Sequence, residues 1–438
     1  MFKWLLLLVA YLPFQIALNP RPEIDLASLR LFIILLFGVW LLGSLIAKSW
    51  PSLIYFKNIQ AVALSLFLIL AFFSLFGAEN ISWGFRKLIF LLSVCPLYIL
   101  VVVLANNRTK IKKIMVILVK GGGLIALIGL SQFLSSFVFG IERVYQWWAG
   151  YLVPVFNGFN FGALIMAYPS WLVNLNGQTT MRAFSLFSDP HMLSFYLGMI
   201  LPLIVVSICL KFRSKAPKKR SFAPKFPKFL LSVYGLLFIT LLLTFTRGAY
   251  LAIIVTFLVL GGLFWQYLKA KKIALLLCLS LMIFIIPGTP IADRFYSSFD
   301  LSEGSNIGRL EMWQQAGQSG LKNFWQGLGL GGYSLLVEPG LGYRSPATAH
   351  NLYLDIFSEM GVFTLAVWLV LILGTLGQLF SKIGRVKQSE KYLCLGLIGS
   401  LVYFSIHSFF ETAIYNPIIL ALLMVILGLS SSLIKARS

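Results

Sequence analysis

Long apolar runs recur from one end of the 438-residue chain to the other, and they limit its fold more than any other feature. A helix that crosses a bilayer needs about 20 mostly apolar residues. Hydrophobic residues make up 59% of the chain and charged residues only 11%, whereas an ordinary soluble domain carries about 25% charged residues. This composition excludes a soluble enzyme, a disordered protein and a disulfide scaffold. It predicts an all-α polytopic membrane protein.

Twelve of these runs are candidate membrane spans. They are 4–19, 27–47, 59–77, 83–105, 113–137, 190–210, 229–246, 249–268, 273–288, 351–380, 392–408 and 416–434. We therefore expect residues 1–438 to form a single integral membrane domain. Two large loops outside the cytoplasm, 138–189 and 289–350, are expected to carry short helices. A re-entrant hairpin near 152–172 would leave this topology unchanged.

The distribution of charge predicts how the chain is oriented. A net charge of +22 would suggest nucleic-acid binding in a soluble protein, but basic residues in a membrane protein first report topology. With the N-terminus inside and the spans alternating, the inside segments hold most of the 36 Lys and Arg residues and, of the 14 acidic residues, only Glu390. Both termini are therefore expected in the cytoplasm, in contact with membrane lipids rather than nucleic acid.

The basic residues that this topology places outside are mostly arginines. They are Arg21, Arg30, Arg86, Arg143, Arg182, Arg247, Arg294, Arg309 and Arg344. A guanidinium grips phosphate or carboxylate at two points, so one interpretation is an outer site for an anionic group. The other is that these side chains snorkel or pair with outer acids.

Two of these arginines occupy unusual sequence positions. Arg247, in TFTRGAY (244–250), joins two apolar runs with almost no loop between them, and an ionisable residue so placed needs a partner or a function. Arg309 opens a predicted amphipathic helix at 306–322, for which Asn306 is a candidate cap. Backbone N–H groups at a helix N-terminus favour anions, and pairing with a neighbouring glutamate is the alternative.

The segment HNLYLDIFSEMG (350–361) opens the tenth run. His350 is expected at the outer end of a helix, whose dipole would lower the imidazole pKa and leave a neutral base. Asn351 is a candidate cap, and Asp355 and Glu359 must face protein or water. A capping or hydrogen-bonded interfacial histidine is the alternative. For His191 and His407, which also lie near outer helix ends, a structural role is favoured.

The sequence contains no His, Cys and acid cluster at metal-ligand spacing and no P-loop. Residues 327–332 (GLGLGG) fit the dinucleotide pattern formally but lack its strand and helix context, so we interpret them as a tight turn. The cysteines, Cys95, Cys209, Cys278 and Cys394, are expected in the core. We predict no metal, cofactor or nucleotide. The remaining chemistry is transfer of a group from a phosphate-activated lipid donor, with arginines holding the phosphate and histidine as base.

Four motifs in order resemble the bacterial O-antigen ligase and O-antigen polymerase superfamily. They are RAFSLFSDPHMLSFYLGM from residue 182, TFTRGAYLA from 244, GRLEMWQQA with NFWQGLGLGGY from 308, and AHNLYLDIFSEMGVF from 349. The resemblance covers residues 182–380, the predicted ligase-like core. It implies a GT-C-like membrane glycosyltransferase of the bacterial inner membrane with an extracytoplasmic active site.

The resemblance also implies a reaction and a set of site residues. A glycan would move from undecaprenyl pyrophosphate to a hydroxyl of a lipid or saccharide acceptor, without metal. Arg247 and Arg309 would hold the pyrophosphate, Arg182 would make a further phosphate or sugar contact, and His350 would be the base or its orienting partner. Asn351, Asp355 and Glu359 would support it.

Other functions stay open at this point. The motifs do not separate a ligase, which passes a finished glycan to its acceptor, from a polymerase, which joins lipid-linked repeat units. A transporter or flippase for a lipid-linked saccharide or a small anion also fits twelve spans with both ends inside, although its polar sites would be expected near the midplane.

Overall fold

Helices form almost all of the protein. The computed structural model describes residues 1–21, 24–48, 58–161, 170–175, 177–214, 228–268, 270–337 and 347–435. The first half contains α1 (Phe2–Tyr11), η1 (Leu12–Phe14), β1 (Ala17–Arg21), β2 (Ile24–Ala27), α2 (Ser28–Ile46), α3 (Ile59–Ser74), η3 (Leu75–Gly77), α4 (Ile81–Val94), α5 (Pro96–Leu104), α6 (Arg108–Phe139), α7 (Ile141–Trp147), η4 (Trp148–Leu152), α8 (Val153–Phe156), β3 (Leu172–Leu175) and β4 (Gln178–Met181).

The second half contains α10 (Pro190–Ser214), α11 (Lys228–Leu242), α12 (Arg247–Leu268), α13 (Lys271–Leu281), η5 (Met282–Ile285), α14 (Pro290–Tyr296), η6 (Ser297–Phe299), α15 (Gly304–Lys322), α16 (Gly332–Val337), α17 (Leu352–Ile383), α18 (Gln388–His407) and α19 (Pro417–Lys435). The strands form two antiparallel hairpins, β1 with β2 and β3 with β4.

Eleven of the twelve predicted spans coincide mainly with a helix or a pair of helices, whereas the first, 4–19, runs past α1 and η1 into strand β1. Within the described residues, eight helices are long and apolar enough to cross a membrane, or nine if the bent pair formed by α13–η5 and α14–α15 is one span. The helices Phe2–Phe14 and Lys228–Leu242 are apolar but shorter. The structure therefore confirms an integral membrane protein built of helices, while the number twelve stays a prediction. The proposed hairpin near 152–172 falls partly outside the described residues.

Asparagine side chains cap the N-termini of four helices. The side-chain oxygens of Asn58, Asn80, Asn107 and Asn351 accept backbone N–H groups in the first turns of α3, α4, α6 and α17. Such a cap satisfies donors that have no partner within the helix. The predicted cap at Asn306 is wrong, because α15 begins earlier, at Gly304, and the Asn306 amide donates to the carbonyls of Ser297 and Asp300.

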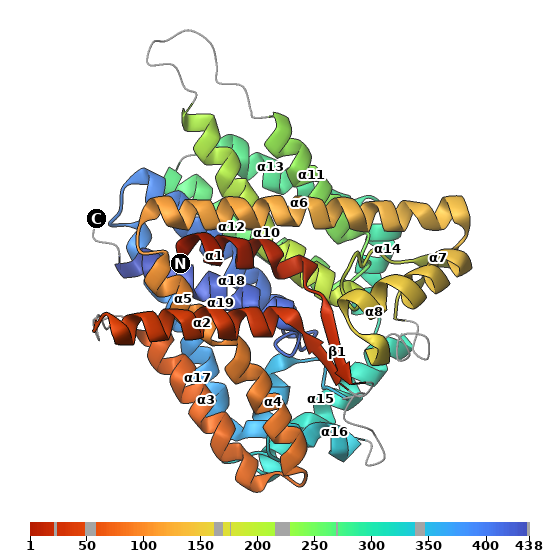
Figure 1. Ribbon diagram of the computed structural model, residues 1–438. Coiled ribbons are helices and arrows are strands. Elements are labelled where there is room, and N and C mark those ends of the chain that lie inside the picture. Colours follow the sequence, from red (N-terminus) through yellow and green to blue (C-terminus); the bar gives the residue numbers. More distant parts are fainter. Residues whose placement is uncertain are drawn as a thin grey trace.

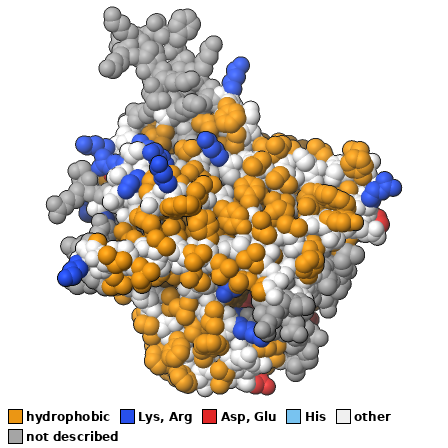
Figure 2. Space-filling model, in the orientation of Figure 1, with side chains coloured by type: hydrophobic (Ala, Val, Ile, Leu, Met, Phe, Trp, Pro, Cys, Tyr) orange, Lys and Arg blue, Asp and Glu red, His pale blue; other side chains and the backbone are white. Residues whose placement is uncertain are grey.

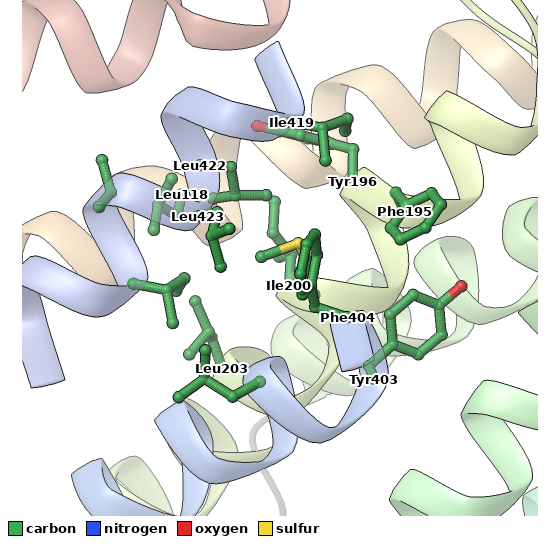
Figure 3. Packing of buried hydrophobic residues seen from close by; sticks show 14 of the residues in the cluster. Leu118, Phe195, Tyr196, Ile200, Leu203, Tyr403, Phe404, Ile419, Leu422 and Leu423 are labelled. Atoms are coloured by element: carbon green, nitrogen blue, oxygen red, sulfur yellow. The ribbon is translucent and has the colours of Figure 1, made fainter. Parts of the chain in front are cut away.

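Helices α10, α18 and α19 form the centre of the bundle. Residues 418–433 of α19 are buried on every side, as expected for a helix that is hydrophobic all round. Figure 3 shows side chains of α10, α18 and α19 converging with Leu118 of α6. The peripheral helix α2 instead leaves apolar residues such as Leu35 and Ile46 exposed, as a lipid-facing helix would. Cys95, Cys209 and Cys394 are buried as predicted, but Cys278 is exposed on α13.

The two ends of the bundle differ. Figure 1 shows α6 running the length of the molecule, from beside the chain's N-terminus to α7 at the far end. At the first end Lys110 lies over the Phe2 ring, Arg108 pairs with Glu390, and Lys382 donates to the carbonyl of Ile434. Lys and Arg side chains gather near this end on the face shown in Figure 2, and hydrophobic side chains cover the broad middle. The candidate site lies at the opposite end.

Helix α17 is broken close to that site. Gly361 has φ 75° and ψ 178°, a backbone conformation that residues other than glycine rarely adopt. The loop 324–328 fills the break: Val362 N–H donates to Phe324 O at 2.9 Å, and Leu328 N–H to Ser358 O at 2.8 Å. Gly327 and Gly329 also have positive φ and lie directly against the backbone of Glu359 and Ala78. The prediction that GLGLGG makes a tight turn against a helix is confirmed.

Candidate active site

A histidine and a glutamate from different loops meet at the far end of the bundle. His350 precedes α17, and Glu411 lies between α18 and α19. The Nδ1 atom of His350 is 2.8 Å from Oε2 of Glu411. The Glu411 side chain is 10% exposed and that of His350 is 39% exposed. The Glu411 carboxylate is thus largely buried, whereas the His350 imidazole is partly exposed.

The charge of Glu411 controls the imidazole. Its attraction raises the pKa of His350 above the ordinary histidine value, against the smaller effects of burial and of Arg309. The predicted lowering by the helix dipole is therefore wrong, because a full charge in contact outweighs a partial charge at a helix end. Burial alone would raise the pKa of Glu411, but His350, His191 and Arg309 together hold it below its ordinary value.

Arg309 of α15 lies near enough to this pair to influence both of its members electrostatically. The helix begins at Gly304, so Arg309 lies in its second turn and not at its N-terminus. Its guanidinium acts electrostatically on both Glu411 and His350. Within the described part of the chain, no hydrogen bond or salt bridge engages it. The alternative, an exposed pairing with Glu311 or Glu303, is not found among the described residues, and Glu303 instead binds Arg247 and Arg294.

Arg182, for which a phosphate or sugar contact stays a prediction, is buried and bonded to protein groups. It is 6% exposed and donates to the carbonyls of Thr244 and Ser170 and to the hydroxyl of Thr246. Burial lowers its pKa to about 9, and the positive charges of Arg294 and Arg309 add to this effect. The side chain fixes the turn between α11 and α12. Its charge lies near those of Arg294 and Arg309, which also lie near Arg247, and these four arginines form a positive cluster.

Arg247 and Arg294 are anchored in the same cluster. Arg247, the first residue of α12, forms a salt bridge with Glu303 and donates to Ser297 O and to Ser305 Oγ. Arg294 donates to Phe245 O at 3.3 Å and lies 3.5 Å from Glu303. The predicted partner of Arg247 is thus present, and it is protein. Arg344 lies outside the described residues.

The predicted supporting residues have separate roles. Asn351 caps α17 by accepting from the N–H groups of Tyr353 and Leu354. Asp355 accepts from Ala349 N–H at 2.9 Å and from the hydroxyl of Thr412. Both residues therefore hold the backbone that carries His350.

Glu359 belongs to a different pair. Its carboxylate accepts from Lys87 of α4 at 2.9 Å, and the Lys87 ammonium lies 4.5 Å from the centre of the Tyr415 ring. The sequence analysis missed Lys87, because 272 residues separate it from its partner. This pair joins the N-terminal helices to α17 next to the break at Gly361.

The two other histidines lie close to Glu411 without sharing the role of His350. His191 follows Asp189, which accepts from Met192 N–H and so caps α10; its Nδ1 is 3.7 Å from Glu411 Oε2. His407 is fully buried and stacks on Phe195 at 3.8 Å. A structural role, as favoured for both, fits His407 best.

An apolar groove of about 600 Å³ opens beside the arginines. Its walls come from α6, the β3–β4 hairpin, the turn after α11, and the start of α14, and its lining residues are Phe133, Phe137, Leu175, Gln178, Thr180, Leu243, Phe245, Pro290 and Ile291. The same turn carries Thr244 and Phe245, whose carbonyls accept from Arg182 and Arg294. One wall of the groove is therefore the turn whose carbonyl groups bind Arg182 and Arg294.

A comparison with known families matches the part of the chain that carries several of these residues. Residues 232–369 match the family model for O-antigen ligase. The resemblance to the O-antigen ligase and polymerase superfamily is confirmed for this segment. It contains Arg247, Arg309 and His350, whereas Arg182 and Glu411 lie outside it. No curated protein matches the chain.

The family match indicates a glycan-processing membrane enzyme. Within the described residues, no group of three or more His, Cys, Asp and Glu side chains is placed to hold a metal ion. The expectation that the reaction uses no metal stays a prediction. Glu411 was missed from the sequence, where its only signal is an acid between two apolar runs in SFFET (408–412).

Proposed function

We propose that this protein is a GT-C-like glycosyltransferase of the bacterial inner membrane. It transfers a glycan from undecaprenyl pyrophosphate to an acceptor hydroxyl outside the cytoplasm, as an O-antigen ligase. The observation that carries the proposal is the His350–Glu411 pair, with 2.8 Å between its nitrogen and oxygen atoms and with the charge of Arg309 acting on the Glu411 carboxylate. The family match to residues 232–369 supports the same reaction class.

His350 is the base in this proposal. Its Nδ1–H donates to Glu411, which leaves Nε2 as the proton acceptor. The neutral imidazole takes the proton of the acceptor hydroxyl as the oxygen attacks the anomeric carbon, and Glu411 stabilises the imidazolium that forms. The raised pKa of His350 makes it a stronger base than an isolated histidine.

The arginine cluster stabilises the leaving group. As the new carbon–oxygen bond forms, the bond to the pyrophosphate breaks and negative charge grows on the departing oxygen. Arg309, whose guanidinium no other described residue engages, grips the pyrophosphate. Arg182, Arg247 and Arg294 are committed to protein partners and contribute positive potential at fixed positions. A single displacement inverts the anomeric carbon.

The groove lined by Phe137, Leu243 and Phe245 suits the polyprenyl chain of the donor. It is apolar along the walls formed by α6 and the turn after α11, and the same turn carries the Thr244 carbonyl that accepts from Arg182. A lipid whose chain lies in the groove would therefore present its pyrophosphate to the cluster.

The charge distribution supports the proposed orientation. Lys110, Arg108 and Lys382 lie at the end of the bundle that includes the start of α1 and the end of α19. Basic residues favour the cytoplasmic side, and this distribution supports a cytoplasmic location for both termini and a site outside.

The test uses purified protein in liposomes with undecaprenyl-pyrophosphate-linked glycan and a panel of lipid and saccharide acceptors. We expect release of undecaprenyl pyrophosphate with one-step transfer to an acceptor, unaffected by EDTA. Growth of a ladder on the lipid carrier would instead identify a polymerase of the same superfamily.

Variants link the reaction to the site. His350→Ala is expected to abolish release while the protein still inserts and folds, and Cys278→Ser, on the exposed face of α13, is the control. Full activity of His350→Ala would contradict the assignment of this active site. Saccharide or anion movement across the bilayer without any release would show a transporter.

A further inference from the structure

One buried carboxylate links the two loops that carry His350 and Glu411. Asp355 lies in the first turn of α17 and is 3% exposed. Its Oδ1 accepts from the backbone N–H of Ala349, the residue before His350. Its Oδ2 accepts from the hydroxyl of Thr412, the residue after Glu411. A single side chain thus bonds to the immediate neighbour of each member of the pair.

The second loop is held by a further bond. The N–H of Thr412 donates to Oε1 of Glu411 at 3.0 Å, so Thr412 contacts Asp355 through its side chain and Glu411 through its backbone. The carboxylate of Glu411 is therefore fixed at Oε1 by Thr412 while Oε2 faces His350. Thr412 is 7% exposed, so water does not compete freely for these groups.

The first loop needs this restraint. His350 has φ 48°, a left-handed conformation that is strained for a non-glycine residue and persists only where surrounding contacts enforce it. The adjacent contacts are the Ala349 N–H bond to Asp355, the weak bond from His350 N–H to Thr348 at 3.4 Å, and the Asn351 cap. Loss of the Asp355 bond would let this turn relax and move the imidazole.

We propose that Asp355, acting through Ala349 and Thr412, is a positioning residue that sets the register of His350 against Glu411. This inference rests on the proposed function, because it assumes that the pair is the catalytic base. Asp355 itself does not touch the substrate. Its hydrogen bonds, not its charge, do this work.

The other charged groups around His350 allow a specific readout. They are Glu411 in the loop after α18, Arg309 on α15 and Asp355 on α17, and His191 on α10 faces Glu411 from the other side. Glu411 is the largest of these influences on the pKa of His350. A variant that loosens the pair therefore lowers that pKa, whereas a variant that only reduces stability leaves it unchanged.

The test compares Thr412→Val with Thr364→Val in the liposome assay. Thr364 is the control: it is 1% exposed on α17, the helix that carries Asp355, and its hydroxyl donates at 2.8 Å to Met360 O within that helix. We expect Thr412→Val to lower kcat by about ten- to a hundredfold, the cost of a displacement near 1 Å. We also expect it to move the acidic limb of the rate profile to lower pH. Thr364→Val should keep the wild-type kcat and profile.

Substitutions of Asp355 separate hydrogen bonding from charge. Asp355→Asn keeps an acceptor for Ala349 N–H and supplies a donor to Thr412, so kcat should stay within a few-fold of wild type. Asp355→Leu removes both bonds and should resemble Thr412→Val. In a Glu411→Gln background, Thr412→Val should cause little further loss, because both changes act on one contact.

Two results would overturn the inference: an unshifted acidic limb in Thr412→Val, or an Asp355→Asn variant as inactive as Asp355→Leu. Its failure differs from that of the proposed function. If His350→Ala is inactive but Thr412→Val behaves like wild type, only the positioning role is lost. If His350→Ala is fully active, the proposed function itself fails.

Discussion

Replacing Glu411 by Gln tests the core of the proposed mechanism. Glutamine keeps the size of the side chain and an oxygen that can accept from His350 Nδ1 at the observed 2.8 Å, but it removes the negative charge. The variant is expected to be slower, since the imidazolium that forms in the transition state loses its counter-charge. It is also expected to work at lower pH than the wild type.

The size of the effect follows from the geometry of the pair. A hydrogen bond to a charged group contributes about 1.5–3 kcal/mol, and each 1.36 kcal/mol is a factor of ten in rate, so kcat should fall by about 10- to 150-fold. The His350 side chain is 39% exposed, and solvent screening weakens such a contact. We therefore expect a loss near the lower end, about tenfold.

The direction of the pH shift follows from the pKa of His350. Glu411 raises this pKa, and the base is active only when neutral, so the wild-type rate climbs as pH rises through the raised value. Without the charge the pKa falls, and the acidic limb moves to lower pH. The difference between the two proteins is thus largest at alkaline pH.

The assay is release of undecaprenyl pyrophosphate at saturating donor, followed across the acidic and neutral range. Glu390→Gln is the control: Glu390 is a fully buried glutamate whose carboxylate lies 2.6 Å from Arg108 at the other end of the bundle. The Glu390→Gln variant should be less stable to heat and should keep the acidic limb of the wild-type pH–rate profile. An acidic limb of Glu411→Gln at or above the wild-type pH would refute the assignment of the base.

Three further changes test other parts of the structure. Arg309→Lys should lower kcat and raise the donor KM in the same assay, because an ammonium cannot bind pyrophosphate at two points; an unchanged KM would argue against the phosphate contact. Gly361→Ala should destabilise the protein by at least about 1–3 kcal/mol, because its Cβ would meet the Trp325 carbonyl. Gly377→Ala on the same helix, with open space around it, should not lower the melting temperature, and equal melting of both variants would contradict this account. Ile291→Trp should raise KM for long-chain donors more than for short-chain ones if the groove holds the polyprenyl chain, whereas Ile285→Trp, on the exposed surface outside the groove, should not distinguish them.

Several features of the fold could be predicted because they depend on neighbouring residues. A long apolar run favours a helix through its own residues, and eleven of the twelve predicted runs coincide mainly with helices, whereas 4–19 ends in strand β1. The cap at Asn351 and the tight turn at 327–332 were likewise readable, since capping and glycine conformations are local properties. The cap predicted at Asn306 was wrong because α15 begins at Gly304, before Asn306.

The site was only partly predictable for the opposite reason. The sequence marks His350, Arg309 and Arg247 as unusual, because ionisable groups next to apolar helices need a reason to be there. It does not say which of them stays free. Arg247 is taken by Glu303 and Arg182 by three backbone and hydroxyl partners, while Arg309 makes no such bond among the described residues.

The sequence by itself therefore determined the membrane class, the helices and the concentration of arginine and histidine in the segments predicted outside. The tertiary structure decided the chemistry of each group. Glu411 reaches His350 across 61 residues, and Lys87 reaches Glu359 across 272. Such pairs are set by how α4, α17, α18 and α19 pack, and no local pattern records them. The sign of the pKa shift at His350 depends on one of these contacts, because a buried charge at 2.8 Å outweighs the helix end beside it.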